Sequence, residues 1–321
     1  AEQRQRVSLP GYPFERQRYW IDAKGASVGQ AAHAPQQAQA PIDKWFYSQQ
    51  WHRQPNVQAV SASTERVWLL LMDGNGLGNA LASRLEAHNQ RVIRVLQNAT
   101  FSGNAQATEF SLNRLNKQDY VSLAAALQRD SELQVVSLWD VDDVEHHETG
   151  AFCSAVYLAQ GLSEEGHKAA IHFVGNGVYR IDGEETLQPN KAMLLSASKV
   201  ISQELSGIRS RYLDLGGLGA EAALYADLLT QELLSDWHNH EIAFRGKQRW
   251  QGQHVPLQLS APSASHFKAE GVYLITGGLG KIGEVLAAHI AKQGAKVIVT
   301  SRRADVDKSS RLHDLIDSGQ V

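Results

Sequence analysis

The stretch VYLITGGLGKIG, residues 272–283, decides the fold of the C-terminal part of this 321-residue chain. Val272–Thr276 is an apolar run of strand length, and Lys296–Thr300 is a second such run. Between them, apolar residues at helical spacing predict an amphipathic helix, with Gly294 where a helix C-cap belongs. The face of this helix is expected to carry Ile282, Val285, Leu286 and Ile290. The order strand, glycine turn, helix, strand is typical of a parallel α/β sheet.

The glycines of this turn follow the pattern Gly278-x-Gly280-x-x-Gly283. In this pattern the first glycine permits a tight turn, the second lets the backbone approach a pyrophosphate, and the third lets the helix pack close to the sheet. The free N–H groups at the start of the helix then bind the phosphates. We therefore predict a dinucleotide site; the alternative is a tight structural turn. The predicted site residues are Thr276, Gly277, Gly278, Leu279, Gly280, Lys281, Ile282 and Gly283.

The second strand of this unit ends in Ser301-Arg302-Arg303. A site that prefers NAD usually places an acidic residue here, to accept a hydrogen bond from the ribose 2′-OH. A guanidinium instead pairs with a 2′-phosphate through charge-assisted, bidentate hydrogen bonds. The sequence therefore predicts NADPH as the cofactor, with these three residues in its site. The alternative is that the two arginines are solvated surface residues.

An earlier segment repeats the same order of elements in degenerate form. Val67–Met72 is a predicted strand and Arg91–Val95 another, with a glycine cluster and a leucine-rich helix between them. The cluster places Asn79 where a third glycine would fall, and Asp73 puts a carboxylate close to where phosphates would lie. We predict that this first unit does not bind the cofactor.

The rest of the chain alternates between strands and helices. Such alternation predicts an α/β fold with a parallel sheet covered by helices on both faces. The predicted strands are 135–139, 170–174 and 212–215, and the predicted helices lie near 151–162, 190–205 and 220–234.

Composition excludes several classes of function. A formal net charge of -3 argues against nucleic acid as a partner. The single cysteine, Cys153, excludes a disulfide framework and favours a reducing, cytoplasmic setting. The longest strongly apolar run, residues 67–72, is too short to span a membrane. The chain begins at Ala1 without a signal peptide, which suggests a piece of a longer protein.

A few other patterns are better explained as ordinary structure. Ser196-x-x-Lys199 has the spacing of a known nucleophile motif but lies in an apolar helical stretch. The pairs His146-His147 and His238-x-His240 lie in polar stretches between elements and are expected to be solvated. Cys153 is expected to be a small buried residue of a helix. We therefore predict neither a metal site nor a catalytic residue.

The glycine motif, the Ser301–Arg303 ending and the first unit together resemble the ketoreductase of modular polyketide synthases, a family of the short-chain dehydrogenase/reductase superfamily. The resemblance runs from Trp45 to Val321. It includes a first structural strand at 45–51, a long helix at 190–204, a strand at 211–215 and a closing hairpin at 241–250. Residues 9–20 resemble the strap that follows ketosynthase or acyltransferase domains in these enzymes.

The resemblance implies two Rossmann-like parallel-sheet units. The first is a complete structural subdomain, residues 45–268, and the second, residues 269–321, is only the N-terminal part of a catalytic subdomain. The strap is expected at 1–22 and a flexible linker at 23–44. Lys281 stands where the superfamily usually has glycine.

The resemblance also implies a reaction, which is reduction of a 3-ketoacyl chain to a 3-hydroxyacyl chain by NADPH. The partners implied are an acyl carrier protein, which holds the chain on phosphopantetheine, and neighbouring ketosynthase or acyltransferase domains. The family uses Ser, Tyr and Lys in catalysis, and none of the nine tyrosines here has a lysine four residues later. These residues are expected beyond Val321, so this piece by itself is expected to be inactive. Two alternatives remain open: a degenerate ketoreductase that only spaces neighbouring domains, and a free-standing member of the superfamily.

Overall fold

The computed structural model describes residues 41–57, 66–129, 132–141, 150–183, 185–217, 221–237, 241–259, 265–302 and 311–321. The chain divides into residues 1–45 and residues 46–321. The described residues of the first unit form a short 3-10 turn, Ile42–Lys44, and Trp45. The predicted strap at 1–22 and most of the predicted linker lie outside the described residues.

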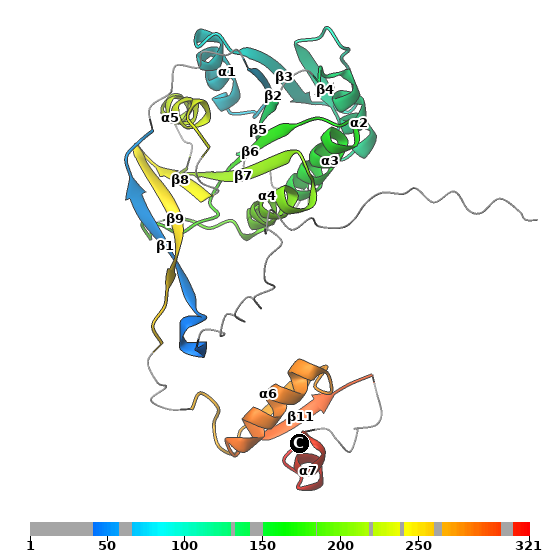
Figure 1. The fold of residues 1–321 in the computed structure, drawn as a ribbon, viewed down its shortest axis with the longest axis vertical. Coiled ribbons are helices and arrows are strands. Elements are labelled where there is room, and N and C mark those ends of the chain that lie inside the picture. The colour runs from blue at the N-terminus through cyan, green and yellow to red at the C-terminus, as the bar shows by residue number, and fades with distance from the viewer. Residues whose placement is uncertain are drawn as a thin grey trace, which may run out of the picture. The chain divides into compact units, whose positions relative to one another are not determined.

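The larger sheet has nine strands in the order β1-β9-β8-β7-β6-β5-β2-β3-β4 (Figure 1). Neighbouring strands from β4 to β8 are parallel, and β9 and β1 are added antiparallel. The strands are β1 Tyr47–Gln54, β2 Val67–Leu71, β3 Arg91–Gln97, β4 Glu109–Leu112, β5 Leu133–Asp140, β6 Ala169–Asn176, β7 Ile208–Leu215, β8 Glu241–Arg245 and β9 Gln248–Pro256. This arrangement is the Rossmann-like α/β fold that the alternation predicts.

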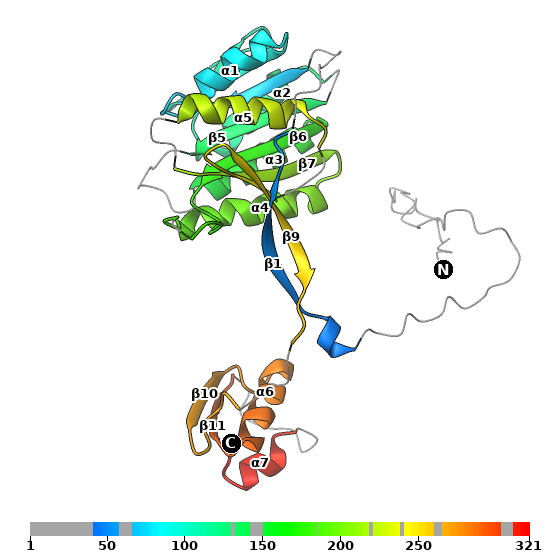
Figure 2. The ribbon, with the colours of Figure 1, turned by 90° about the vertical axis from the view of Figure 1, so that its left-hand side faces the viewer.

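Helices cover both faces of this sheet (Figures 1 and 2). They are α1 Leu77–Ala87, α2 Lys117–Ala126, α3 Gly150–Glu164, α4 Ala192–Glu204 and α5 Ala222–Leu234. Successive side chains of a strand point to opposite faces. Leu69 of β2 accordingly packs with α2, α3 and α4, whereas Trp68 packs with α1 and α5. None of the helices in the described part of the chain is long and apolar enough to cross a membrane.

The predicted strands and helices of this sheet are confirmed, but two elements were not predicted from the sequence. These are the short strand β4 and the helix α2. The signal for α2 was Asn116, whose side chain accepts a hydrogen bond from the Gln118 N–H at 3.2 Å and so caps the helix start. β4 has only four residues and α2 has a weak apolar pattern, so neither gives enough periodicity to be detected in the sequence.

The smaller sheet pairs β10 Val272–Thr276 with β11 Lys296–Thr300 in parallel, as predicted. Helix α6, Lys281–Lys292, connects them, and a short helix α7, His313–Asp317, follows. Gly294, with a φ of +84°, lies just past the end of α6. The confirmed elements are therefore a parallel strand–helix–strand unit that ends at the expected glycine.

The predicted packing face of α6 is wrong in part. Ile290 is buried, but Ile282, Val285 and Leu286 are 78%, 48% and 46% exposed. The helix instead packs through small residues, with Gly283, Ala287 and Ala291 all buried at four-residue spacing. Side chains without bulk let the helix axis lie close to the sheet.

A buried charge cluster ties helix α5 to strands of the larger sheet. Glu232 of α5 accepts hydrogen bonds from Arg211 of β7 at 2.9 Å and from Arg249 of β9 at 2.8 Å. Arg211 also donates to Nδ1 of His172 at 2.9 Å. Burial and the nearby Arg211 charge lower the pKa of His172, so this ring is neutral. The carboxylate of Glu232 is therefore the counter-charge for two buried guanidinium groups.

We predict that Glu232→Gln destabilises the larger sheet and the helices packed on it by about 3 kcal/mol or more. The reason is that two buried guanidiniums then lack a counter-charge. Urea denaturation followed by tryptophan fluorescence measures this loss. The matched control is Glu86→Gln, which removes an exposed pair with Arg94 and should cost less than about 1 kcal/mol. Equal losses for the two variants would contradict the prediction.

Candidate functional site

The glycine loop between β10 and α6 lies beside the end of β11. Thr276 pairs with Thr300 at the ends of the two parallel strands, and the Gly278 N–H donates to the Thr300 carbonyl at 3.0 Å. The Gly280 N–H donates to the Gly277 carbonyl at 2.9 Å, which closes the turn. The loop and the residues after β11 therefore meet at one edge of the sheet.

Each of these glycines meets a different steric demand. Gly277, not Gly278, has the left-handed backbone, with a φ of +70°, so the tight turn assigned to Gly278 is made one residue earlier. A Cβ on Gly278 would lie 2.5 Å from Cβ of Val299 on β11. A Cβ on Gly283 would lie 2.6 Å from the Gly278 Cα and 2.7 Å from the Gly277 carbonyl oxygen. Gly278 and Gly283 therefore let strand, loop and helix touch.

The outer side of the loop is bare backbone. A Cβ on Gly277 would meet no atom within 4 Å, and one on Gly280 would meet only the Gly277 carbonyl oxygen at 3.2 Å. The first N–H groups of a helix have no partner within that helix, and they carry its partial positive charge. The start of α6 is therefore a stretch of backbone free of nearby side chains, called the cradle below, whose partial positive charge fits a phosphate group.

The remaining predicted site residues surround this cradle. Thr276, Lys281 and Ile282 are exposed, and Leu279 packs partly into the small core below the loop. Ser301 and Arg302 are exposed directly after β11, whereas Arg303 lies outside the described residues. Lys281 is the first residue of α6. A positive side chain is unfavourable at the positive end of the helix dipole unless a negatively charged group lies nearby.

The corresponding loop of the larger sheet, between β2 and α1, carries a carboxylate. Asp73 lies four residues before the first residue of α1, and Gly277 lies four residues before the first residue of α6, so the two positions correspond. Its carboxylate accepts hydrogen bonds from the N–H groups of Asn75 at 2.9 Å, Leu77 at 3.0 Å and Gly78 at 2.6 Å. The chain's own anion thus fills the position where a phosphate would bind, which gives a physical reason for the prediction that this unit does not bind the cofactor.

Ordinary structural contacts account for Ser196 and Lys199, whose spacing in the sequence resembles a nucleophile motif. Ser196 donates to the Ala192 carbonyl one turn earlier in α4, and Lys199 forms an ion pair with Glu241 of β8. Cys153 lies on α3 as predicted but is partly exposed rather than buried. The two histidine pairs lie outside the described residues. In the described part of the chain, no group of three or more His, Cys, Asp or Glu side chains is arranged to hold a metal.

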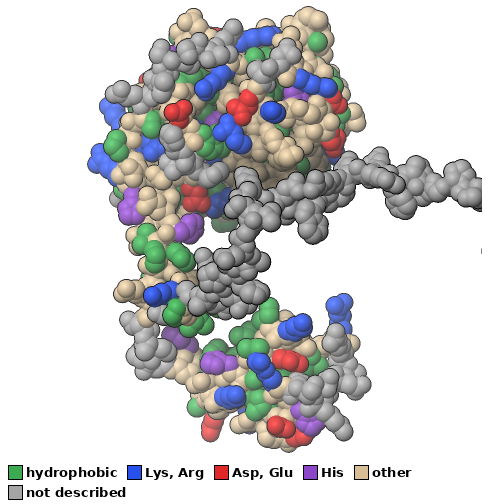
Figure 3. All heavy atoms as spheres, in the orientation of Figure 1, with side chains coloured by type: hydrophobic (Ala, Val, Ile, Leu, Met, Phe, Trp, Pro, Cys, Tyr) green, Lys and Arg blue, Asp and Glu red, His purple; other side chains and the backbone are tan. Residues whose placement is uncertain are grey.

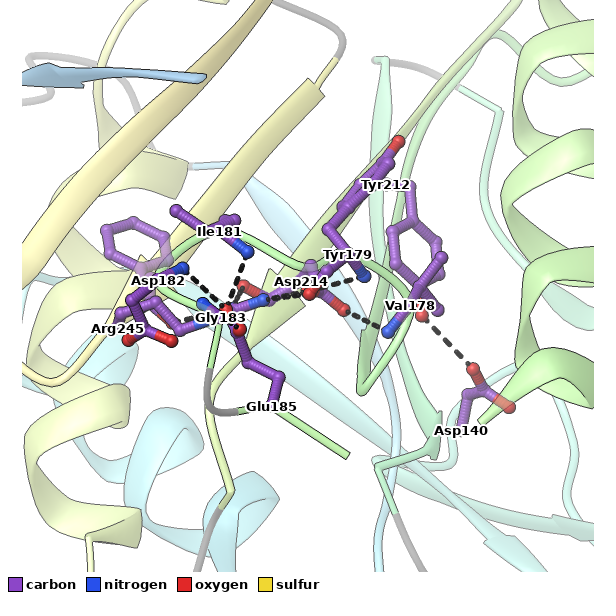
Figure 4. A network of polar contacts seen from close by, with 11 residues as sticks. Asp140, Val178, Tyr179, Ile181, Asp182, Gly183, Glu185, Tyr212, Asp214 and Arg245 are labelled. Carbon is purple, nitrogen blue, oxygen red and sulfur yellow. Dashed lines mark hydrogen bonds and ion pairs between the residues drawn. The ribbon is translucent and has the colours of Figure 1, made fainter. Parts of the chain in front are cut away.

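Sequence reasoning missed a network of polar residues at the carboxyl ends of β5, β7 and β8 (Figure 4). Arg245 donates to Asp214 at 2.7 Å and to Glu185 at 2.8 Å. Tyr212 donates to Asp140 at 3.3 Å. These residues are far apart in sequence and fit no local motif, so only the parallel sheet brings them together.

The network perturbs its carboxyl groups in opposite directions. Burial raises the pKa of Asp140 to about 7, although the charge of Lys191 partly offsets this effect. Burial would also raise the pKa of Glu185, but hydrogen bonds from Arg245 and the Ile181 N–H outweigh it and hold that pKa well below its usual range. Asp140 therefore titrates near neutrality, whereas Glu185 stays ionised beside Arg245.

Residues 271–320 match the family model of the KR domain. The chain is 24% identical to Polyketide synthase PksM from Bacillus subtilis (strain 168), in an alignment that covers 98% of this chain and 7% of that protein. The chain thus spans less than a tenth of the length of this relative.

Two solved structures are similar in fold. One is the adenylation, ketoreductase and pseudo-Asub multidomain structure of a keto acid-selecting NRPS module, with a TM-score of 0.67 at 21% identity over 86% of this chain and 24% of that one. The other is the first ketoreductase of the tylosin PKS, with a TM-score of 0.60 at 22% identity over 81% of this chain and 52% of that one.

The fold and these matches define the class as an α/β, Rossmann-like chain whose fold is similar to that of solved ketoreductases. Within that class, the chain resembles the ketoreductase region of polyketide synthases, as the sequence predicted.

We predict that Gly283→Ala disrupts the loop, because the added Cβ must displace backbone atoms at 2.6–2.7 Å. The expected cost is about 2 kcal/mol, or about thirtyfold faster amide exchange in α6 and β10. The matched control is Gly280→Ala, whose Cβ meets one atom at 3.2 Å and should change exchange by less than about threefold. Comparable exchange rates in the two variants would contradict this account of the loop.

A second prediction concerns Asp140. Its carboxyl binds a proton more tightly in the folded chain, because burial raises the pKa to about 7. Its contribution to stability is therefore complete below the unfolded pKa and is lost as pH rises through about 7. Because of Asp140, the unfolding free energy of the unsubstituted chain should fall between about pH 5 and about pH 8. In Asp140→Asn this fall should be smaller by about 2–3 kcal/mol. Urea denaturation at both pH values measures it, with exposed Asp227→Asn as control. An unchanged pH dependence in Asp140→Asn would contradict the prediction.

Proposed function

We propose that residues 272–302 bind NADPH and that this chain forms part of a ketoreductase of a polyketide synthase. The observation that carries the proposal is the bare backbone cradle at the start of α6, with Arg302 placed one strand away. The family match over residues 271–320 supports it independently. In this proposal, residues 45–268 are the structural subdomain and residues 269–321 begin the catalytic subdomain.

Each part of the cradle has a separate task. The N–H groups at the start of α6 hold the pyrophosphate, and Gly277 and Gly280 keep the approach free of side chains. Lys281 adds a positive charge at the same helix end. Arg302 and Ser301 lie at the adjacent strand end, where a guanidinium and a hydroxyl recognise a ribose 2′-phosphate. NADPH supplies a hydride when bound, and these residues only bind and orient it.

The substrate of the whole enzyme is proposed to be a 3-ketoacyl chain held on an acyl carrier protein by phosphopantetheine. The product is the 3-hydroxyacyl thioester, and neighbouring ketosynthase or acyltransferase domains are the other partners. Support comes from the polyketide synthase relative, whose match runs through the larger sheet as well as the glycine loop. A match of that extent favours a synthase region over a free-standing reductase. We assign no proton donor in this chain.

The mixed surface charge of the larger unit fits this proposal. On the face seen in Figure 3, Lys and Arg side chains are interspersed with Asp and Glu over the described residues. Nucleic-acid-binding proteins instead concentrate one sign of charge along a groove or stripe. The face in view therefore favours protein partners and a small cofactor.

We predict that Arg302→Asp weakens NADPH binding by about tenfold or more while it changes NADH binding by less than about threefold. The reason is that a bidentate charge pair to the 2′-phosphate is replaced by repulsion. Fluorescence titration of this chain with each nucleotide measures both affinities without turnover.

The matched control is Lys292→Asp, which makes the same charge change at the far end of α6 and should affect both nucleotides equally. Equal losses for NADPH and NADH in Arg302→Asp would contradict the role of Arg302. If the unsubstituted chain binds neither nucleotide, the proposal that residues 272–302 bind NADPH in this chain is contradicted.

A further inference from the structure

Helix α6 has an unfavourable charge at its first residue. It begins at Lys281, whose side chain is exposed and positively charged. The start of a helix has a partial positive charge, so acidic residues are favoured in its first turn and lysine is favoured in its last. Without a ligand, Lys281 therefore makes the first turn of α6 less stable than a neutral residue at the same position would.

Packing does not account for this lysine. The buried positions through which α6 packs include Gly283, Ala287 and Ala291, whereas the side chain of Lys281 is exposed. Within the described part of the chain, its ammonium group has no hydrogen bond and no ion pair. A residue that costs stability and makes no internal contact is typical of a binding site.

Neighbouring side chains leave this edge of the smaller sheet positively charged. Glu284 is the acidic residue of the first turn, but it has an interaction of its own and, in the described residues, forms no ion pair with Lys281. Arg302 adds an exposed guanidinium just after the end of β11. Two positive side chains and a helix start therefore lie near a single carboxylate, which favours an anionic ligand.

The start of α1 provides a comparison within the same chain. Its first residue is the neutral Leu77, and the Asp73 carboxylate accepts hydrogen bonds from the N–H groups of Leu77 at 3.0 Å and of Gly78 at 2.6 Å. At α6 the position of this carboxylate is taken by Gly277, and the first residue is a cation. One carboxylate matches the backbone charge of α1. The start of α6 has the same backbone charge and a full side-chain charge, so it matches a ligand with more than one negative charge.

We infer that Lys281 binds a diphosphate directly and that the bound diphosphate stabilises the first turn of α6. The inference rests on the proposed nucleotide site, and it assigns the part that NADPH and NADH have in common to one side chain. Arg302 then recognises the 2′-phosphate, which NADH lacks. The two positive charges have separate effects: Lys281 sets the affinity for both nucleotides, and Arg302 sets the choice between them.

The effect on the helix start is tested without ligand. The Glu284 N–H donates to the Gly280 carbonyl at 2.9 Å, so its protection against amide exchange reports the first turn. Lys281→Gln should raise this protection by about two- to fivefold, because the two residues have similar helix propensity and only the charge is lost. Lys292→Gln removes the same charge from the last turn and should not raise it. Unchanged or lower protection in Lys281→Gln would overturn the inference.

The binding role is tested by isothermal titration of the full 321-residue chain with inorganic pyrophosphate at constant ionic strength. Lys281→Gln should weaken pyrophosphate binding by about fivefold or more, because a charge-assisted contact is lost, and Lys292→Gln should leave it within about twofold. Orthophosphate should bind the unsubstituted chain about tenfold more weakly than pyrophosphate. Equal pyrophosphate affinity in Lys281→Gln and the unsubstituted chain would overturn the inference, as would equal affinity for the two anions.

Nucleotide titrations separate this inference from the proposed function. Lys281→Gln should weaken NADPH and NADH by the same factor, about fivefold or more, because both carry the diphosphate. If Lys281→Gln binds NADPH as tightly as the unsubstituted chain does, the inference is overturned and the proposed function stands. A loss confined to NADPH would also overturn it, because Lys281 would then recognise the 2′-phosphate. If the unsubstituted chain binds pyrophosphate but not NADPH, the proposed function is contradicted, and a weaker pyrophosphate affinity in Lys281→Gln still supports the role of Lys281.

Discussion

The partial positive charge at the start of a helix is stabilised by a negative partner, and the way this charge is met differs between α1 and α6. At α1 the chain supplies that partner with the Asp73 side chain. At α6 the equivalent position is Gly277, which leaves open space above the backbone. A single carboxylate thus distinguishes a self-contained helix start from the one that we propose accepts a phosphate, within the same strand–loop–helix framework.

Most of the fold could be predicted from the sequence because its signals are local. β2 is a continuous apolar run, β5 and β6 are mostly apolar, and α1 repeats leucine at four-residue spacing. The glycine loop was recognisable because three steric demands fall within a few residues. The face of α6 was not, because the apolar pattern there favours large side chains whereas close packing selects small ones. β4 and α2 are too short or too weakly patterned to detect.

The parts that escaped sequence reasoning depend on contacts between residues far apart in the chain. Arg245 pairs with Glu185, which lies sixty positions earlier in the chain, and Arg211 of β7 pairs with Glu232 of α5. A buried charge is costly without a partner, and here each partner comes from another part of the chain that folding brings close. The role of Asp73 was visible as a conflict with phosphate, but its three N–H partners required the folded loop. The proposed nucleotide residues remain predictions from the sequence that the loop geometry supports.

The antiparallel pairing of β1 with β9 has a consequence for how the larger sheet can exist within a longer polypeptide. Tyr47, at the start of the sheet, lies opposite Pro256, at its end, so the chain enters and leaves this sheet about one strand spacing apart. A unit whose two ends emerge side by side can be inserted between other domains without forcing them apart. Such an element adds bulk and binding surface to a multidomain protein while leaving the path of the flanking chain almost unchanged.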